Sequence, residues 1–409
     1  MFVPARASPL ILPFIFSLMT LAKNRLLTAD RIHDGRQFLA AGSVLEVAGD
    51  GTIVAIHASA PAGEVDYFKG TLTPGFVNVH CHLELSHMKG MVPEATGLIP
   101  FLQAIPTQRN NFTDEQKKAA RHEAYNELVR NGVVAVGDIA NSEETLDLRE
   151  LAELHLHTFI ECIGFTEAFA QARLDYSMGV LNAFAAQQNN ETMLRQSIIP
   201  HAPYSVSGPL FRLINDAAPQ SLISIHNQES PAEDEYYLFK TGDVRNLLSG
   251  LGVNDDFFQP TGKSSLQSYL PYFSTDHPII LVHNTCTSAS DIAFAQRSGR
   301  SVFWCLCPNA NQYIEQALPD VALLHTQAKN ICIGTDSLAS NHALSVLGEL
   351  QTLKRHFPFL EWEALLRWGT YNGAQALQMN EVIGSFEPGK KPGIIHLENL
   401  EDEVVKRVV

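Results

Sequence analysis

Eight short runs of apolar, β-prone residues recur along this chain, and polar stretches with a helical pattern separate them. The runs occupy residues 75–80, 133–139, 157–165, 196–205, 221–230, 278–285, 301–309 and 331–337. Apolar strands that alternate with helices are typical of a parallel sheet covered on both faces. The pattern therefore predicts an α/β fold, a (β/α)8 TIM-like barrel over residues 71–375, with a doubly wound open sheet as the alternative.

The helical pattern is clearest in TDEQKKAARHEAYNELVRNG, residues 113–132. Thr113 and Gln116 have the spacing of a capping box at the start of a helix, and Gly132 supplies the stop. Between these two signals, small and apolar residues recur every four positions and give the helix one buried face. We expect a helix that covers the sheet next to the strand at residues 133–139.

The two ends of the chain have a different pattern. Residues 23–70 and 376–409 are punctuated by glycine and are β-prone, so we expect them to pair into a small β-sandwich domain beside the barrel. Residues 1–22 include the apolar run PLILPFIFSLMTLA. This run is a signal segment, a consequence of a true start at Met19, or part of the fold, and we expect ordinary folded sequence from Lys23 onward.

The charge and the cysteines restrict the partners and the compartment. A formal net charge of -15 repels phosphate backbones and anionic lipids, so we expect neither nucleic acid nor a membrane as a partner. The six cysteines lie within or at the ends of apolar runs rather than in spaced loops. This placement favours reduced, buried thiols and a cytoplasmic location.

Two histidines stand at the end of the first strand, in GFVNVHCHLELS. Alternate residues of a strand point the same way, so His80 and His82 project together while Cys81 faces the other side. In a barrel of this type the carboxyl ends of the strands carry the active site. Both imidazoles are therefore expected at the mouth where chemistry takes place.

Three more strands end in residues of the same kinds. The fifth ends in His226 with Glu229 three residues later, the sixth in His283, and the eighth in Asp336. Three neutral imidazoles and a carboxylate suit Zn2+ with one position open for water, which such an ion activates. Glu229 is then the natural proton shuttle, and His283, where it is not a ligand, is placed to hold the attacking hydroxide or polarise the substrate.

The ordered motifs PGFVNVHCHLELS, HAPYSVS, LVHNT, CPNAN and GTDS resemble the amidohydrolase superfamily over nearly the whole chain. Within it they are most similar to the cytosine deaminase-like and chlorohydrolase branch. That branch includes guanine deaminase, S-adenosylhomocysteine/methylthioadenosine deaminase and aminofutalosine deaminase. The resemblance implies a metal-dependent hydrolase acting on carbon–nitrogen bonds other than peptide bonds.

Specific roles follow from this resemblance. It implies one divalent metal ion, Zn2+ with Fe2+ as the alternative, bound by His80, His82, His226 and Asp336. Glu229 would take a proton from the activated water and pass it to a ring nitrogen, and His283 would stabilise the attacking hydroxide beside Asp336. The fourth strand, IIPHAPYS, lacks the lysine that bridges two metals in binuclear relatives, so a single metal ion is implied.

Another class of zinc deaminase uses H-x-E together with P-C-x-x-C. His82 and Glu84 satisfy the first half of that pattern, but the chain contains no P-C-x-x-C, which excludes the class. Two residues are candidates for substrate binding. His201 matches a position that contacts the ligand in nucleoside-type relatives, and a carboxylate at Glu84 could accept a hydrogen bond from a ring N–H or a hydroxyl.

We therefore expect hydrolytic deamination of a small amino-substituted N-heterocycle, such as a purine or a nucleoside. The alternatives are a chlorohydrolase, a cyclic amide hydrolase of the same superfamily, or a member that binds metal without catalysis. The discriminating observation is the leaving group that appears in solution. A homodimer is left open by the sequence.

Overall fold

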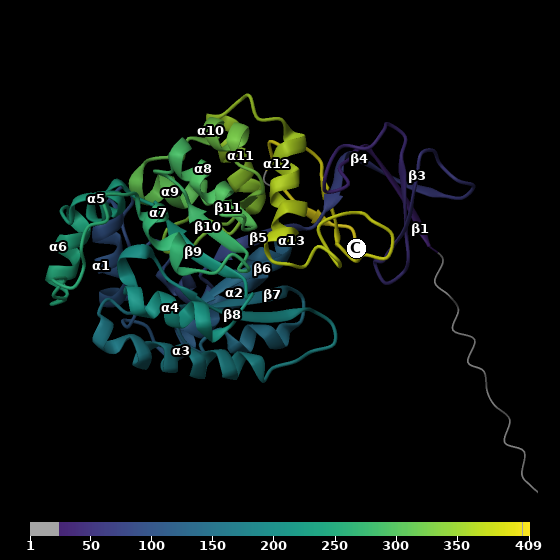
Figure 1. The fold of residues 1–409 in the computed structure, drawn as a ribbon. Coiled ribbons are helices and arrows are strands. Elements are labelled where there is room, and N and C mark those ends of the chain that lie inside the picture. Colours follow the sequence, from purple (N-terminus) through teal and green to yellow (C-terminus); the bar gives the residue numbers. More distant parts are fainter. Residues whose placement is uncertain (1–23, 403) are drawn as a thin grey trace, which may run out of the picture.

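The computed structural model describes residues 24–402 and 404–409, so the expectations for residues 1–22 lie outside the described part of the chain. Figure 1 shows helices packed around central strands, with a smaller sheet at the side where the C-terminus lies. Within the described ranges, no helix combines the length and the apolarity that crossing a membrane requires.

Two four-stranded parallel sheets form the centre of the molecule. Their strand orders are β5-β6-β7-β8 and β12-β11-β10-β9. The strands are β5 (Phe76–Cys81), β6 (Val133–Ala140), β7 (His155–Cys162), β8 (Leu194–Pro200), β9 (Ile223–Asn227), β10 (Ile279–His283), β11 (Val302–Leu306) and β12 (Ile331–Ile333). β5 and β6 are buried along their whole length, as expected for a parallel sheet covered on both faces. The eight predicted strands and the α/β class are thus confirmed.

The strands pair as two separate sheets, so the closed barrel stays a prediction. Backbone hydrogen bonds nevertheless connect the two sheets. The His226 amide donates to the His201 carbonyl at 3.0 Å, which links β9 to the segment after β8. The Thr335 amide, just beyond β12, donates to the His80 carbonyl in β5, also at 3.0 Å.

Helices fill most of the connections between the strands. They are α1 (Leu98–Gln108), α2 (Asp114–Arg130), α3 (Ala170–Ala185), α4 (Gly208–Ala217), α5 (Pro231–Phe239), α6 (Asp243–Gly250), α7 (Ser265–Tyr269), α8 (Ala289–Arg297), α9 (Pro308–Glu315), α10 (Val321–Gln327), α11 (Val346–His356), α12 (Trp362–Gly369) and α13 (Tyr371–Ala376). The predicted helix is α2, and its capping box is present. Thr113 Oγ1 accepts from the Gln116 amide at 3.3 Å, and Gln116 Oε1 accepts from the Thr113 amide at 2.9 Å.

A six-stranded sheet joins the two ends of the described chain. Its order is β14-β13-β4-β1-β2-β3, from β1 (Arg25–Ile32), β2 (Val44–Val47), β3 (Ile53–His57), β4 (Val65–Pro74), β13 (Ile394–Leu397) and β14 (Lys406–Arg407). β13 pairs antiparallel with β4, so residues from both termini form one sheet (Figure 1). A second sheet that would complete a sandwich is not confirmed, and the domain boundaries stay predictions.

Gly75 connects this sheet directly to the strand that carries the first two histidines. A Cβ atom at this position would lie 2.2 Å from Val134 Cγ1 and 3.0 Å from the Pro392 carbonyl oxygen. A larger residue would therefore clash with β6 and with the segment that precedes β13. The close approach fixes the position of β5 relative to the terminal sheet.

Candidate active site

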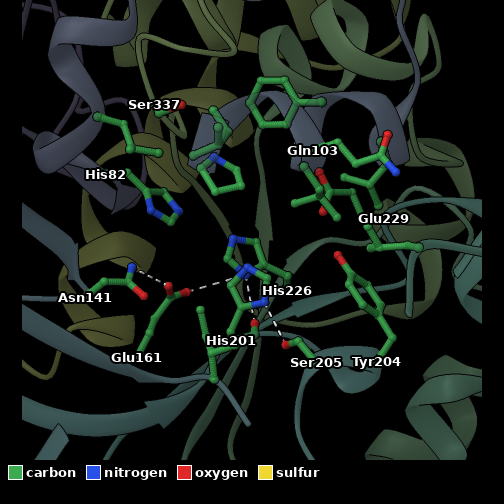
Figure 2. A pocket seen from close by; sticks show the side chains of 18 of the residues that line it. His82, Gln103, Asn141, Glu161, His201, Tyr204, Ser205, His226, Glu229 and Ser337 are labelled. Carbon is green, nitrogen blue, oxygen red and sulfur yellow. Dashed lines mark hydrogen bonds and ion pairs between the residues drawn. The ribbon is translucent and has the colours of Figure 1, made fainter. Parts of the chain in front are cut away.

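A cavity of about 570 Å³ opens at the carboxyl ends of the parallel strands. Seven of the eight predicted site residues line it, among them Glu84, His82, His201, His226, Glu229 and Asp336. His283 lines it too, and His80 lies below it, 1% exposed, with its ring centroid 4.9 Å from those of His82 and His226. Figure 2 shows His82, His201, His226 and Glu229 around this space. The volume is in the range typical of small-molecule sites.

Three of the four predicted metal ligands gather with His283 around one point, and the fourth, His82, lies beside Asp336. His80, His226, His283 and Asp336 each offer a ligand atom, and these four atoms lie within 4.8 Å of one another. Asp336 Oδ1 lies 3.5 Å from Nε2 of His80 and 3.5 Å from Nε2 of His82. Four histidines and one aspartate from four strand ends are thus brought together, as predicted; which of them bind a metal stays a prediction.

Backbone strain accompanies this arrangement. His283, Asp336 and Gln228 have φ values of 74°, 56° and 46°, in the left-handed region that residues other than glycine rarely adopt. Each such position costs on the order of 1–3 kcal/mol and persists only where surrounding contacts enforce it. The predicted eighth strand stops at Ile333, and Asp336 reaches the site through this left-handed turn rather than from the strand itself.

The donor atoms fit a divalent metal ion. Both ring nitrogens of His80 are buried and have no hydrogen-bond partner among the described residues, which leaves a lone pair free for coordination. Burial lowers the pKa of His80 to about 4, so this imidazole is neutral at pH 7. Burial opposes ionisation of Asp336, but the close approach of the His80 and His82 rings, each with Nε2 at 3.5 Å, holds its pKa well below the ordinary value. Neutral imidazoles with one carboxylate are ligands that zinc and similar ions accept.

Hydrogen bonds orient His226 and His201. His226 Nδ1 lies 2.8 Å from the His201 carbonyl oxygen, which can only accept, so Nδ1 carries the proton and Nε2 keeps a lone pair. His201 Nδ1 lies 2.7 Å from Ser205 Oγ. Figure 2 shows this chain of contacts from Ser205 through His201 to His226. His201 therefore lies between the predicted ligands and the wall of the cavity.

Glu229 lies in the same cavity, beside His283. Glu229 Oε1 is 3.6 Å from His283 Nε2, and His283 Nδ1 is held by Asn311 Oδ1 at 2.8 Å. Burial raises the pKa of Glu229 to about 8, which allows this carboxyl group to gain and lose a proton near neutral pH. The predicted proton shuttle and the predicted hydroxide-stabilising histidine are thus neighbours.

Glu84 lines the cavity from the short 3-10 helix Leu83–Met88. Its Oε2 accepts from the Asn141 amide at 2.9 Å, its Oε1 accepts from Asn141 Nδ2 at 3.0 Å, and Arg109 Nη2 is 3.8 Å away. Among the described residues that line the cavity, Arg109 is the one arginine or lysine. Whether Glu84 contacts a substrate stays a prediction.

Glu161, at the end of β7, is a residue that the sequence reasoning missed. It lines the cavity, and with His82 and His226 it offers a second group of ligand atoms within 4.8 Å of one another. Burial raises its pKa to about 8. The signal was present in the sequence, because Glu161 interrupts the apolar run of HTFIECIGF near a strand end, as His226 does in its own strand.

The outer part of the cavity is apolar. Its lining there comes mainly from α1, α6 and the segment after β7: Leu98, Phe101, Leu102, Ile105, Ile163, Phe165, Leu247 and Leu251. Figure 1 shows α1 and α6 at the same end of the molecule. The cavity thus combines a polar inner end, where the histidines meet, with an apolar outer wall.

Comparisons with known proteins point to one family. The model of the amidohydrolase family matches residues 71–409. An adenosine deaminase from Helicobacter pylori is 27% identical over 346 residues, which cover 81% of this chain and 80% of that protein. The crystal structure of Helicobacter pylori aminofutalosine deaminase in complex with methylthio-coformycin has a TM-score of 0.75 at 21% identity and covers 91% of each chain. An adenosine deaminase from Xanthomonas campestris with bound zinc has a TM-score of 0.72 at 22% identity, covering 91% of this chain and 84% of that one.

Proposed function

The chain belongs to the amidohydrolase family, and we propose that it catalyses the metal-dependent hydrolytic deamination of an adenosine-like nucleoside. The observation that carries the proposal is the convergence of four histidines, Asp336 and Glu229 on one cavity of about 570 Å³. The similarity to an adenosine deaminase supports the same reaction class. The predicted relationship to the amidohydrolase superfamily is confirmed by the family match.

We propose that the metal ion is Zn2+, bound by His80, His82, His226 and Asp336. The neutral state of the buried imidazoles and the ionised state of Asp336 support this ligand set, and the zinc-bound relative supports the choice of ion. When bound, the ion would supply Lewis-acid activation of a water molecule. Fe2+ is the alternative, since nitrogen and oxygen ligands accept both ions.

Two residues beside the proposed metal ligands, Glu229 and His283, have different roles in the reaction. Glu229 accepts a proton from the attacking water and delivers it to a ring nitrogen of the substrate. His283, fixed by Asn311 and 3.6 Å from Glu229, stabilises the attacking oxygen beside Asp336. The water oxygen bonds to the ring carbon. The second proton of the water then passes from the added hydroxyl to the amino group, the carbon–nitrogen bond breaks, and the amino group leaves as ammonia. A carboxyl group with a pKa near neutrality is suited to this double transfer.

We propose that His201 and Glu84 contribute to substrate binding at the two sides of the cavity. His201 adjoins the ligand His226, which places it near the reacting ring. Glu84 holds Asn141, whose side chain faces the same space (Figure 2). The apolar outer wall formed by α1 and α6 would accommodate an uncharged substituent of the nucleoside.

The closed barrel, the location and the assembly are part of the proposal. The hydrogen bonds between the His226 amide and the His201 carbonyl, and between the Thr335 amide and the His80 carbonyl, support closure of the two sheets into one barrel. Side chains of both sheets, among them Val79 and Ile280, share one buried cluster, which supports it further. The six free cysteines support a cytoplasmic location, and a homodimer stays a prediction.

The test is release of ammonia from the zinc-loaded protein, with bound metal measured in parallel. The panel contains adenosine, 5′-methylthioadenosine, guanine, cytosine and an aminotriazine. We expect release from the adenine nucleosides at a rate at least tenfold above that from the other compounds. Silence across the whole panel, with about one metal ion per chain still bound, would refute deamination and favour expulsion of chloride or opening of a cyclic amide.

A further inference from the structure

Glu161 lies on the side of the cavity opposite to Glu229. Figure 2 shows Asn141 and Glu161 at one side of the space, and Glu229 and Tyr204 at the other. Glu161 is 4% exposed, so its carboxylate is buried apart from the face that it presents to the cavity. The proton transfers described above do not use this group.

One oxygen of Glu161 is fixed by the protein. Glu161 Oε2 accepts from Asn141 Nδ2 at 2.9 Å. The same Nδ2 donates to Glu84 Oε1 at 3.0 Å, so both protons of the Asn141 amide are used. Glu84 and Glu161 are therefore held as a pair by one asparagine, and the orientation of Glu161 is set before any ligand arrives.

The other oxygen has no partner. Glu161 Oε1 is buried and receives no hydrogen bond from the described residues. His226 Nδ1 lies 3.7 Å from it, but this nitrogen already donates its proton to the His201 carbonyl at 2.8 Å. A buried carboxyl oxygen without a hydrogen-bond partner is costly, and a molecule in the cavity can supply that partner.

The surroundings of Glu161 favour a substrate over a metal ion as that partner. Ile163 and Phe165, at alternate positions beyond Glu161, also line the cavity and continue the row outward along an apolar wall. A ligand that packs against this row reaches Glu161 Oε1 at its inner end. The two histidines that could share a metal ion with Glu161 are His82 and His226. His226 is already part of the group that includes Asp336, and His82 Nε2 lies 3.5 Å from Asp336 Oδ1.

We propose that Glu161 is a substrate-binding residue whose Oε1 accepts a hydrogen bond from a sugar hydroxyl of the nucleoside. The inference rests on the proposed function. In adenosine the only donor of the base is the amino group that leaves, so the remaining donors are the hydroxyls of the ribose. A site built to accept such a hydroxyl discriminates strongly against analogues that lack it.

The experiment compares Glu161→Gln with the wild-type protein on adenosine and on 2′,3′-dideoxyadenosine. Glutamine keeps the shape and the contact with Asn141, but it presents an amide N–H where the carboxylate presented an acceptor. The control is Glu143→Gln, the same substitution at an exposed position just after β6 and outside the cavity. Bound zinc, the unfolding temperature, kcat and KM are measured for each protein.

We expect the wild-type protein and Glu143→Gln to prefer adenosine by at least tenfold in kcat/KM. In Glu161→Gln this ratio should fall to about one, mainly through slower turnover or weaker binding of adenosine, while the zinc content stays unchanged. Loss of zinc would identify Glu161 as a metal ligand and overturn the proposal, as would an equal loss on both substrates. Absence of ammonia from both adenosine and 5′-methylthioadenosine with the wild-type protein would instead refute the proposed function.

Discussion

At the scale of single residues, Glu229 is the side chain on which the proposed reaction depends most. Replacing Glu229 by glutamine leaves the volume and the surrounding contacts nearly unchanged but removes the group that accepts and delivers a proton. We expect Glu229→Gln to keep its bound metal and to lose about 10²- to 10⁴-fold in kcat. Metal analysis and steady-state ammonia release measure both quantities.

The matched control for this prediction is Glu235→Gln in α5, the same substitution at an exposed position outside the cavity. It should retain wild-type turnover. A Glu229→Gln protein that kept most of its kcat would show that another group carries the proton, and the assignment of Glu229 would then be wrong.

The residues of the site differ in how far the sequence predicted them. His80, His226 and His283 interrupt apolar strands at their ends, so strand periodicity alone placed them at one edge. Asn311 and Asn141 have no such local signal, because their contacts with His283 and Glu161 depend on the packing of distant segments. Those contacts became visible only in three dimensions.

At the scale of elements, the turn between β9 and α5 carries Glu229, and hydrogen bonds of the preceding residue, Gln228, hold this turn in place. Gln228 has a φ of 46° and is fully buried. Its amide donates to Glu233 Oε1 at 2.9 Å, its Nε2 donates to Asp234 and Asp291 at 3.1 Å, and its Oε1 accepts from Thr287 at 2.9 Å. These contacts compensate the strained backbone that directs the next residue into the cavity.

Gln228→Ala removes the hydrogen bonds that the Gln228 side chain makes with Asp234, Asp291 and Thr287. Because a displacement of about 1 Å at a reacting group can cost on the order of 10²-fold, we expect kcat to fall about 10- to 100-fold with KM and metal content little changed. Gln220→Ala is the control, since Gln220 also has a positive φ, of 65°, but is exposed and outside the cavity. Equal effects of the two substitutions on kcat would contradict a positioning role for Gln228.

We expect the buried carboxyl group of Glu349, in α11, to make the stability of the protein depend on pH. Glu349 is buried, accepts from the Asn309 amide at 2.9 Å and from Asn341 Nδ2 at 2.8 Å, and burial raises its pKa to about 8 from an ordinary value of 4.5. The folded state therefore binds this proton more tightly than the unfolded state. Its contribution to stability is present at low pH and is lost as the pH rises from about 4.5 to about 8.

Glu349→Gln has no proton to lose at this position. We expect the free energy of unfolding of the variant, relative to the wild-type protein, to increase by about 1.4 kcal/mol for each pH unit within that window. Denaturant unfolding at several pH values gives this difference, and Glu361→Gln, which removes an exposed charge next to α12, provides the comparison. A difference that stays constant between pH 5 and 8 would show that Glu349 titrates alike in both states.

The sequence predicted helices and strands that have a local signal, such as a capping box, but it did not predict where each strand ends. The capping box at Thr113 specifies the start of α2 within four residues of sequence. β12 stops at Ile333 although the β-prone pattern continues toward Asp336, because Thr335 and Asp336 turn their amides to the His80 carbonyl in another strand. Local β-propensity does not predict where this strand ends, because the end is set by a hydrogen-bond acceptor that lies far away in the sequence.

At the scale of the whole molecule, the alternation of strand and helix patterns predicted the fold class. It did not predict whether the two parallel sheets close into a barrel or how the strands of the terminal sheet are ordered. Alternating strands and helices predict parallel pairing. β13 pairs with β4, although the two strands lie near opposite ends of the chain. The sequence of neither strand indicates which strand it pairs with. The contacts between the two parallel sheets, from β9 to the segment after β8 and from the segment after β12 to β5, likewise depend on hydrogen bonds between residues far apart in the sequence.

The proposed metal should act on the stability of the whole molecule. Five side chains, from the ends of β5, β9 and β10 and from the turn after β12, meet around one point. There Asp336 is ionised, and the ring nitrogens of His80 have no hydrogen-bond partner among the described residues. An ion that binds the folded but not the unfolded chain stabilises it by about 2.7 kcal/mol at a free concentration 100 times its Kd. We expect zinc to raise the unfolding temperature of the chelator-treated protein and the chelator to reverse the change.

Asp336→Asn tests whether this stabilisation comes from the proposed ligands. The variant keeps the shape of the side chain but loses the negative charge that offsets the charge of the ion, so zinc should bind more weakly and raise its unfolding temperature by less than half of the wild-type increment. Asp320→Asn, a control at the start of α10, leaves the site intact and should give the full increment. A wild-type protein whose unfolding temperature did not respond to zinc would contradict a metal site at these residues, since a ligand that binds only the folded state must stabilise it.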